Sequence, residues 1–381
     1  MESSLPPVQP AAIPDAALRS RIAAGERINA DEAMLLLDHW PLHDLGRIAF
    51  ERKRALHGDT ITYIVNKQIN PTNLCVHACR FCEFAAKPGD AHVYSLEEDE
   101  ILASLEAEPG LAEVHIVGGL WKSWGMERSL ALVSRIRSEH PTLWIKAFTA
   151  VEVDFFAKTT KSDWRTVLTA MRAAGVDGMP GGGAEVLNER IHQELYAAKM
   201  GPANWIAIHE LAHQMGIPTN ATLLFGHIET SAEIVDHLIT LRSMQDRAPG
   251  FEAFIPLAFQ PGTTGITTSL VSPMHMLRVI AVSRLVLDNI PHIKAYWPTL
   301  QLETGVVALT FGADDLDGTL GKERIMQLAG THAPEAMVSS VMERLIRESG
   351  QTPARRNGRF GHLPAAPASS TSPTKESALC Q

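Results

Sequence analysis

From Gly58 onwards the chain alternates apolar segments of strand length with amphipathic segments of helix length. The expected strands span residues 61–70, 113–119, 144–151, 177–182, 219–226 and 251–259, with weaker candidates at 292–297 and 306–313. Several of the helical segments between them end in a glycine such as Gly175 or Gly216, which is typical of a helix C-terminus. Up to eight strands separated by helices predict a (β/α)8 barrel of the TIM type, with a doubly wound open sheet as the alternative.

The segments on either side of this alternation differ from it in composition. Residues 16–57 predict a helical N-terminal extension, because NADEAMLLL opens with a capping asparagine and continues with a helical period. Residues 1–15 are rich in Pro and Ala and predict a flexible arm. Residues 351–381 are rich in Pro, Ala, Ser and Thr and predict a disordered tail. The barrel is therefore expected over residues 58–350.

Charge and hydropathy narrow the class of protein. Of the 381 residues 45% are hydrophobic, which is enough for a large core, and the formal net charge is −9. An acidic chain of this kind argues against a nucleic-acid partner. No segment reaches the roughly 18 apolar residues of a membrane span, and no charged-then-apolar leader opens the chain. We therefore expect a cytoplasmic enzyme with no membrane partner.

Three of the four cysteines lie within eight residues, directly after the first expected strand, in NPTNLCVHACRFCEF. Their spacing is Cys75-x3-Cys79-x2-Cys82, and the fourth, Cys380, falls in the expected disordered tail. Cysteine thiolates are the usual ligands of a [4Fe-4S] cluster. Three of them hold three irons and leave the fourth iron open to the amino and carboxylate groups of S-adenosylmethionine (SAM).

Other uses of these cysteines fit the pattern less well. A structural zinc site completed by His77 or His92 would normally show two separated ligand pairs, and no second pair is present. A thioredoxin-like motif formed by Cys79 and Cys82 leaves Cys75 unexplained. A non-catalytic iron–sulfur electron carrier normally ligates every iron with protein and is small.

Polar or glycine-rich segments follow several of the other expected strands. In both α/β arrangements the carboxyl ends of the strands surround the active site, so these segments should converge. A glycine there lets a ligand approach the backbone, and a carboxylate can accept hydrogen bonds from a ribose diol. Ordinary turns, packing and helix caps are the alternatives. The candidate residues are Gly118, Gly119, Thr149, Glu152, Glu185, His227 and Glu229.

The cysteine motif, at the end of a first barrel strand, resembles that of the radical SAM superfamily. More narrowly, the chain resembles the aminofutalosine synthases of the futalosine route to menaquinone, from about Asp31 to about Ile346. The segments that carry this resemblance are NPTNLCVHACRFCEF, EVHIVGGL, IKAFTAVEV, GMPGGGAEVL, TNATLLFGHIET, FEAFIPLAFQP, NIPHIKAYW and FGADDLDGT. The resemblance implies a radical SAM barrel. In it, Phe81, Gly118, Gly119, Thr149, Glu152 and Glu185 would lie at the cofactor, and His227 and Glu229 would be catalytic candidates.

The resemblance also implies a reaction. A 5′-deoxyadenosyl radical from SAM adds to the vinyl carbon of 3-[(1-carboxyvinyl)oxy]benzoate, and rearrangement with loss of CO2 gives 6-amino-6-deoxyfutalosine. A reductant such as flavodoxin or ferredoxin would supply the electron. Two related kinds of enzyme share the cysteine motif and stay as alternatives: the hydrogen-abstracting dehypoxanthine futalosine cyclase and the enzymes that build the deazaflavin chromophore.

A substrate with two carboxylates requires basic or polar donors in the pocket. By position the candidates are Lys146, Arg284, His292 and Lys294, and the sequence does not choose among them. The acidic run from Asp314 to Asp317 lacks the oxygen-ligand spacing of a metal site. It is expected to form a helix-capping loop or a wall of the pocket.

Overall fold

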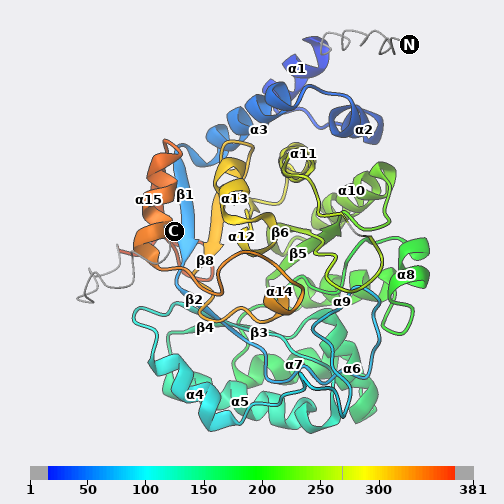
Figure 1. Cartoon of the computed structure of the whole chain (residues 1–381), viewed down its shortest axis with the longest axis vertical. Coiled ribbons are helices and arrows are strands. Elements are labelled where there is room, and N and C mark those ends of the chain that lie inside the picture. The colour runs from blue at the N-terminus through cyan, green and yellow to red at the C-terminus, as the bar shows by residue number, and fades with distance from the viewer. Residues whose placement is uncertain (1–15, 268, 365–381) are drawn as a thin grey trace, which may run out of the picture.

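The computed structural model describes residues 16–267 and 269–364, and within them parallel strands close into a barrel (Figure 1). The strands are β1 (Thr60–Ile64), β2 (Asn66–Ile69), β3 (Glu113–Ile116), β4 (Trp144–Ala147), β5 (Thr219–Phe225), β6 (Phe251–Ala258), β7 (His292–Ile293), β8 (Asp315–Gly318) and β9 (Thr352–Arg355).

The ring of strands confirms the predicted (β/α)8 barrel. The first predicted strand is interrupted at Val65, so that β1 pairs with β8 and β2 pairs with β3. Further parallel pairs join β3 to β4, β5 to β6 and β6 to β7. Isolated parallel bridges complete the ring: Lys146 with Gly178, Met179 with Thr219, and Lys294 with Asp315.

One predicted strand is wrong. Residues 306–313 form the end of helix α13 (Leu302–Ala308) and the turn after it, and the eighth strand is β8, with the sequence DLDG. A short apolar run such as VVALTFGA does not distinguish a strand from a buried helix by period alone. The predicted strand at 177–182 is also reduced to the two bridging residues 178 and 179.

Helices cover the outside of the barrel, and α7 shows how the sequence forms them. Asp163 accepts a hydrogen bond from the N–H of Thr166 at its start, a cap that stabilises a helix by about 1 kcal/mol. Gly175 ends it with φ +108°, as its predicted C-terminal role requires. The barrel helices are α4 (Glu98–Glu106), α5 (Met126–Glu139), α6 (Ala150–Thr160), α7 (Trp164–Ala174), α8 (Glu189–Leu195), α9 (Pro202–Gln214), α10 (Ser231–Arg247), α11 (Pro273–Val286), α12 (Trp297–Leu300), α13, α14 (Ile325–Leu328) and α15 (Ser339–Glu348), with a 3-10 turn η1 (Lys122–Trp124).

Three helices precede the barrel: α1 (Ala16–Ala23), α2 (Ala30–Asp38) and α3 (Leu42–His57). Asn29 and Glu32 form a reciprocal capping box at the start of α2. Helix α3 packs against α11, and α2 packs against α10 and α11 (Figure 1). Residues 1–15, the predicted flexible arm, lie outside the described residues. Among the residues that the structure describes, no helix has the length and apolar character needed to cross a bilayer.

The prediction of a disordered tail is wrong for residues 352–364. Strand β9 pairs in parallel with β1, and the next residue, Arg356, is fully buried and ion-paired with Asp315. The average composition of residues 352–381 does not indicate this order, because it depends on the four residues of β9 and on the guanidinium of Arg356. The rest of the predicted tail, including Cys380, lies outside the described residues.

Candidate active site

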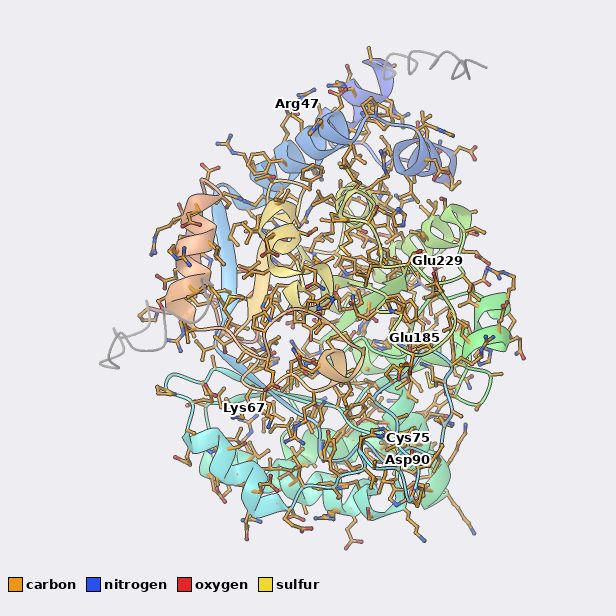
Figure 2. All side chains as sticks on the ribbon, in the orientation of Figure 1. Arg47, Lys67, Cys75, Asp90, Glu185 and Glu229 are labelled. Atoms are coloured by element: carbon orange, nitrogen blue, oxygen red, sulfur yellow. The ribbon has the colours of Figure 1, made fainter. Side chains whose placement is uncertain are left out.

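A cavity of about 340 Å³ lies inside the barrel and reaches the cysteine loop. Cys75 and Glu185, both marked in Figure 2, belong to its lining. Successive side chains of a strand point to opposite faces, so alternate residues of each strand face the interior. The polar strand residues that line the cavity in this way include Asn66, Gln68, Glu113, His115, Lys146, Asn220 and Thr222.

Cys75, Cys79 and Cys82 lie on the loop after β2, and all three line the cavity as free thiols. Burial raises the pKa of the Cys79 thiol to about 12, and it raises the pKa of Cys82 as well. Metal ions bind thiolates, so a bound cation would have to release these protons.

The spacing of the three thiols fits a cluster better than a single ion. Thiolates around one zinc ion, each about 2.3 Å from the metal, lie roughly 4 Å apart. Among the described residues, no cysteine belongs to a group of three or more possible ligands whose ligand atoms all lie within 4.8 Å of one another. His77 also lines the cavity, but it forms no such group with the thiols. The three thiols are therefore not gathered around one single-ion site in the described chain.

Two glycines at the end of β3 support the cysteine loop. A Cβ on Gly119 would lie 2.2 Å from the carbonyl oxygen of Leu74, and the Gly119 N–H donates to Thr72 O at 2.7 Å. Only glycine allows this approach of the two segments. Gly118 lines the cavity and Gly119 does not, so the structure brings only the first of these two predicted cofactor residues to it.

Thr149 and Glu152 form a capping box at the start of α6 and also line the cavity. Glu152 accepts hydrogen bonds from the Thr149 N–H at 2.7 Å and from the Gly118 N–H at 3.3 Å. Burial raises the pKa of the Glu152 carboxyl to about 7 in spite of these hydrogen bonds. The pair therefore ties the end of β3 to α6 and leaves a titratable group in the cavity wall.

Glu185 lies in the cavity wall in a left-handed backbone conformation, with φ +46°. Non-glycine residues rarely adopt this conformation, and those that do are concentrated at functional sites. Its carboxylate is ion-paired with Lys199, which lies 5.3 Å from the ring centre of Phe81 and 4.6 Å from that of Tyr196. Burial would lower the pKa of Lys199, but Glu185 and Cys79 together hold it above its usual value.

Lys199 is a residue that sequence reasoning missed. It stands in YAAKMG, outside every predicted strand end, and nothing in that segment distinguishes it from a surface lysine. The structure nevertheless brings it together with the predicted Phe81 and Glu185.

His227 and Glu229 do not line the cavity. The Glu229 carboxylate accepts hydrogen bonds from the backbone N–H groups of Gly226 and His227, and lies 3.0 Å from Nδ1 of His227. Burial would raise the pKa of Glu229, but His227 and these N–H groups hold it below its usual value. The two side chains shape the loop between β5 and α10, so their predicted contact with SAM or substrate finds no support in the geometry.

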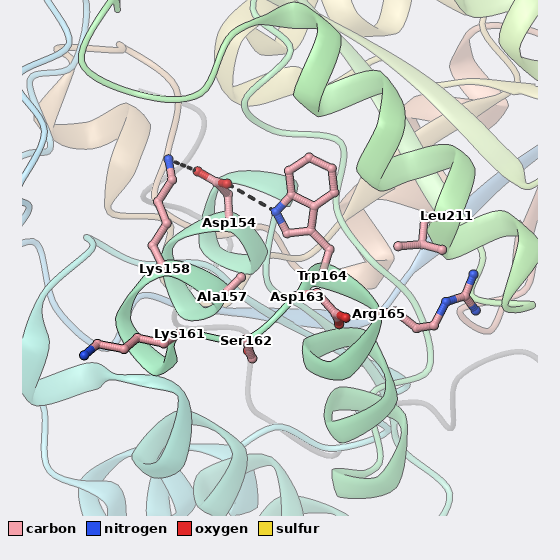
Figure 3. A pocket seen from close by; sticks show the side chains of 9 residues that line it. All are labelled: Asp154, Ala157, Lys158, Lys161, Ser162, Asp163, Trp164, Arg165 and Leu211. Carbon is pink, nitrogen blue, oxygen red and sulfur yellow. Dashed lines mark hydrogen bonds and ion pairs between the residues drawn. The ribbon is translucent and has the colours of Figure 1, made fainter.

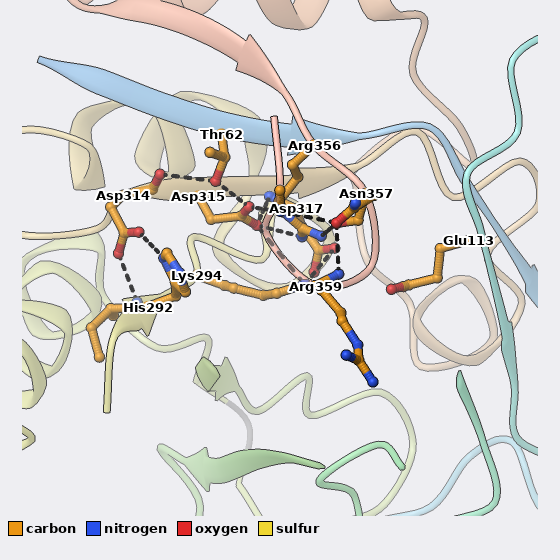
Figure 4. A network of polar contacts seen from close by, with 12 residues as sticks. Thr62, Glu113, His292, Lys294, Asp314, Asp315, Asp317, Arg356, Asn357 and Arg359 are labelled. Carbon is orange, nitrogen blue, oxygen red and sulfur yellow. Dashed lines mark hydrogen bonds and ion pairs between the residues drawn. The ribbon is translucent and has the colours of Figure 1, made fainter. Parts of the chain in front are cut away.

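The four basic candidates divide into two pairs. Lys146 and Lys294 line the cavity, whereas Arg284 and His292 are bonded to Asp314 and do not. Asp315 and Asp317 of the acidic run lie in strand β8 and Asp314 directly precedes it, so the run is not a helix-capping loop. Figure 4 shows its carboxylates bonded to residues from separate segments, and Asp317 forms part of the cavity wall, as the alternative prediction had it.

Three lining residues also carry buried polar atoms without a hydrogen-bond partner among the described residues: His115 Nε2, Asn220 Oδ1 and Gln260 Oε1. A sequence signal for two of them exists, because EVHI and TNATLLF place polar residues at every second position of otherwise apolar strands. Burial lowers the pKa of His115 to about 3, so its imidazole is neutral at physiological pH.

A second hollow, of about 510 Å³, lies between α6, α7 and α9 (Figure 3). Lys158 pairs with Asp154 at 2.6 Å, and the Trp164 indole donates to the same carboxylate at 3.2 Å. It shares no lining residue with the barrel cavity, so it belongs to the outer helical layer.

Comparison with known proteins agrees with this geometry. Residues 69–241 match the family model described as the radical SAM superfamily, and residues 248–368 match the CofH/MqnC C-terminal region. The chain is 37% identical to an aminodeoxyfutalosine synthase of Thermus thermophilus over 90% of this chain and 94% of that protein. It is 36% identical to a cyclic dehypoxanthine futalosine synthase of Streptomyces coelicolor over 90% and 87%. The crystal structure of methylornithine synthase superposes with a TM-score of 0.71, at 17% identity, over 89% of this chain and 97% of that one.

Proposed function

Because the chain belongs to the radical SAM superfamily, we propose that it is an aminodeoxyfutalosine synthase acting on 3-[(1-carboxyvinyl)oxy]benzoate. Membership implies a [4Fe-4S] cluster and SAM, and the spacing of Cys75, Cys79 and Cys82 fits the three-cysteine motif of that cluster. The observation that carries the proposal is the similarity to such a synthase along nearly the whole length of both chains.

Each part of the cavity has a task in this proposal. The three cysteines would hold the cluster, which with bound SAM supplies the 5′-deoxyadenosyl radical when an external donor such as flavodoxin or ferredoxin reduces it. Glu185 would accept hydrogen bonds from the ribose hydroxyls, with Lys199 holding its carboxylate in place. Phe81, Gly118, Thr149 and Glu152, which line the same cavity, would contact the cofactor.

The barrel would also shield a bound radical from bulk water. The cavity lies inside the ring of strands, and the buried ion pairs of Lys146 with Glu113 and of Lys294 with Asp317 line it. A reactive carbon radical held there meets the substrate before it meets solvent or other side chains.

The test is anaerobic turnover of the reconstituted protein. The chain is loaded with iron and sulfide, reduced with dithionite, and mixed with SAM and 3-[(1-carboxyvinyl)oxy]benzoate. Mass spectrometry should detect 6-amino-6-deoxyfutalosine. Cys79→Ser should lose most of the iron and all of the product, while Cys380→Ser, outside the motif, serves as the matched control. Absence of any adenosyl-containing product from the wild type would refute the proposal.

A second candidate is a hydrogen-abstracting enzyme of the cyclase type, which the 36% identity to the Streptomyces coelicolor protein favours. Abstraction releases free 5′-deoxyadenosine, whereas addition keeps the adenosyl group on the product. Incubation with SAM and dehypoxanthine futalosine, followed by measurement of free 5′-deoxyadenosine, distinguishes the two.

A further inference from the structure

We call the part of the cavity wall formed by Lys146, Lys294 and their ion-pair partners Glu113 and Asp317 the floor. Its two buried ammonium groups have unused hydrogen-bond donors. Lys146 and Lys294 are each 2% exposed, and both line the cavity. Within the described chain, Lys146 makes one hydrogen bond, to Glu113 at 3.0 Å, and Lys294 makes one, to Asp317 at 3.3 Å. An ammonium group carries three N–H donors, and leaving such donors unmatched in a buried site is costly. Each lysine therefore keeps donors for a bound acceptor.

Neutral polar groups accompany the two lysines. The neighbouring strand places His115 opposite Lys146, and its Nε2 has no hydrogen-bond partner among the described residues. Asn220, from β5, lines the same cavity with its Oδ1 also unpartnered. A neutral imidazole can donate a hydrogen bond from Nε2 to an anion without adding charge, whereas the Asn220 Oδ1 can only accept one.

The formal charges around the floor balance before a ligand binds. Lys146 pairs with Glu113, and Lys294 and Arg356 are set against the carboxylates of Asp317 and Asp315, the latter four shown in Figure 4. Arg356 forms a close ion pair with Asp315. The contact between Asp315 and Lys294 is more distant, at 3.8 Å. The two ammonium groups repel one another across the cavity, and a shared anion relieves this repulsion.

We propose that Lys146 and Lys294, assisted by His115, bind a carboxylate of the acid that this enzyme consumes. The inference rests on the proposed function and extends it, because it assigns the benzoate carboxylate to the floor. That carboxylate survives the reaction, whereas the one on the vinyl carbon leaves as CO2. Binding of the benzoate carboxylate at a fixed position would leave the vinyl carbon free to react with the adenosyl radical near the cysteine loop.

Direct binding tests the site without turnover. The reconstituted enzyme with SAM is titrated calorimetrically with 3-hydroxybenzoate and with 3-hydroxybenzamide, which differ in the charge of one group. The wild type should bind the acid about 10- to 100-fold more tightly than the amide, the range expected for hydrogen bonds to a charged group. Lys294→Met should lose most of this preference.

Removing one lysine leaves a buried carboxylate unpaired, so paired variants keep the test valid if single variants fail to fold. Lys294→Met/Asp317→Asn and Lys146→Met/Glu113→Gln each remove a complete ion pair. Both should reduce the preference for the acid at least 10-fold, because a merely structural role would change the binding of acid and amide equally. Lys67→Met is the matched control: Lys67 lies on β2, bonds to Ser104 and Glu108, and does not line the cavity.

Two results would overturn the inference: equal binding of acid and amide by the wild type, or an unchanged preference in both paired variants. Either result can occur in an enzyme that still makes 6-amino-6-deoxyfutalosine. Conversely, an enzyme that makes no adenosylated product can still show the acid preference. Failure of the site and failure of the proposed function are therefore distinguishable.

Discussion

Arg356→Met should destabilise the barrel, although the residue lies in a segment that looks disordered in sequence. The Arg356 and Asp315 side chains are both fully buried, and two hydrogen bonds join the guanidinium to the carboxylate. Removing one partner of a buried pair costs about 3–5 kcal/mol, because the other charge stays buried without compensation. Lys294 lies 3.8 Å from Asp315, and Thr62 donates to it at 2.6 Å. We therefore expect the lower end, about 3 kcal/mol.

The measurement is urea unfolding of the reconstituted protein, followed by far-UV circular dichroism under anaerobic conditions. The double variant Arg356→Met/Asp315→Asn tests the cause. An asparagine at this position can still accept from the backbone N–H of Asp317 through its one side-chain oxygen, its amide nitrogen can donate to the Thr62 hydroxyl, and it carries no charge to bury. It should therefore be more stable than the single variant. Arg347→Met, which breaks an exposed pair with Glu343, should leave the unfolding midpoint unchanged.

The penalty should also depend on pH. Burial alone would raise the pKa of Asp315, but Arg356 and Lys294 hold it below its usual value. The stabilisation is therefore present above about pH 4 and is lost as the pH falls through the folded-state pKa. The reasoning is refuted if Arg356→Met unfolds within about 0.5 kcal/mol of the wild type at pH 7, since surface substitutions reach that size. It is refuted equally if the double variant is less stable than the single one.

Three other variants test the cofactor end of the cavity. Gly119→Ala places a Cβ 2.2 Å from Leu74 O and should lower the bound iron to less than about half of wild type. Gly125→Ala is the control, because its Cβ would lie 3.3 Å from Lys122 O and should leave the iron content unchanged. Normal iron content in Gly119→Ala would contradict the prediction. Glu152→Gln keeps the capping box but removes a carboxyl whose pKa is raised to about 7, so from pH 5 to 8 the wild type should lose about 2 to 3 kcal/mol of unfolding free energy relative to the variant. Parallel pH curves would show that Glu152 does not titrate in this range. Glu185→Ala should weaken SAM binding about 10-fold at constant iron content, and unchanged SAM affinity would remove Glu185 from the site.

The sequence predicts those parts of the molecule that depend on short-range patterns. The capping asparagine of α2, the terminal glycine of α7 and the cysteine spacing each involve a few consecutive residues, and the structure has them as expected. The sequence did not choose among the basic candidates, but the elements of the structure do. Arg284 lies on a helix, which in a (β/α)8 barrel is outside the ring, and His292 begins its strand, away from the carboxyl end. Lys146 lies near the end of β4, one residue from Ala147.

Other features depend on partners far apart in the chain, and β8 shows how far sequence reasoning extends. Three buried carboxylates, Asp315 and Asp317 in β8 and Asp314 directly before it, require a similar number of buried cations, since an unpaired buried charge is too costly. The structure supplies them separately: Arg284 pairs with Asp314, Arg356 with Asp315 and Lys294 with Asp317. Had DDLDG been recognised as a strand, the number of cations could have been predicted. The identities of these cations could not be predicted, because Arg356 is 41 residues from Asp315 and lies in a segment whose average composition is typical of disorder.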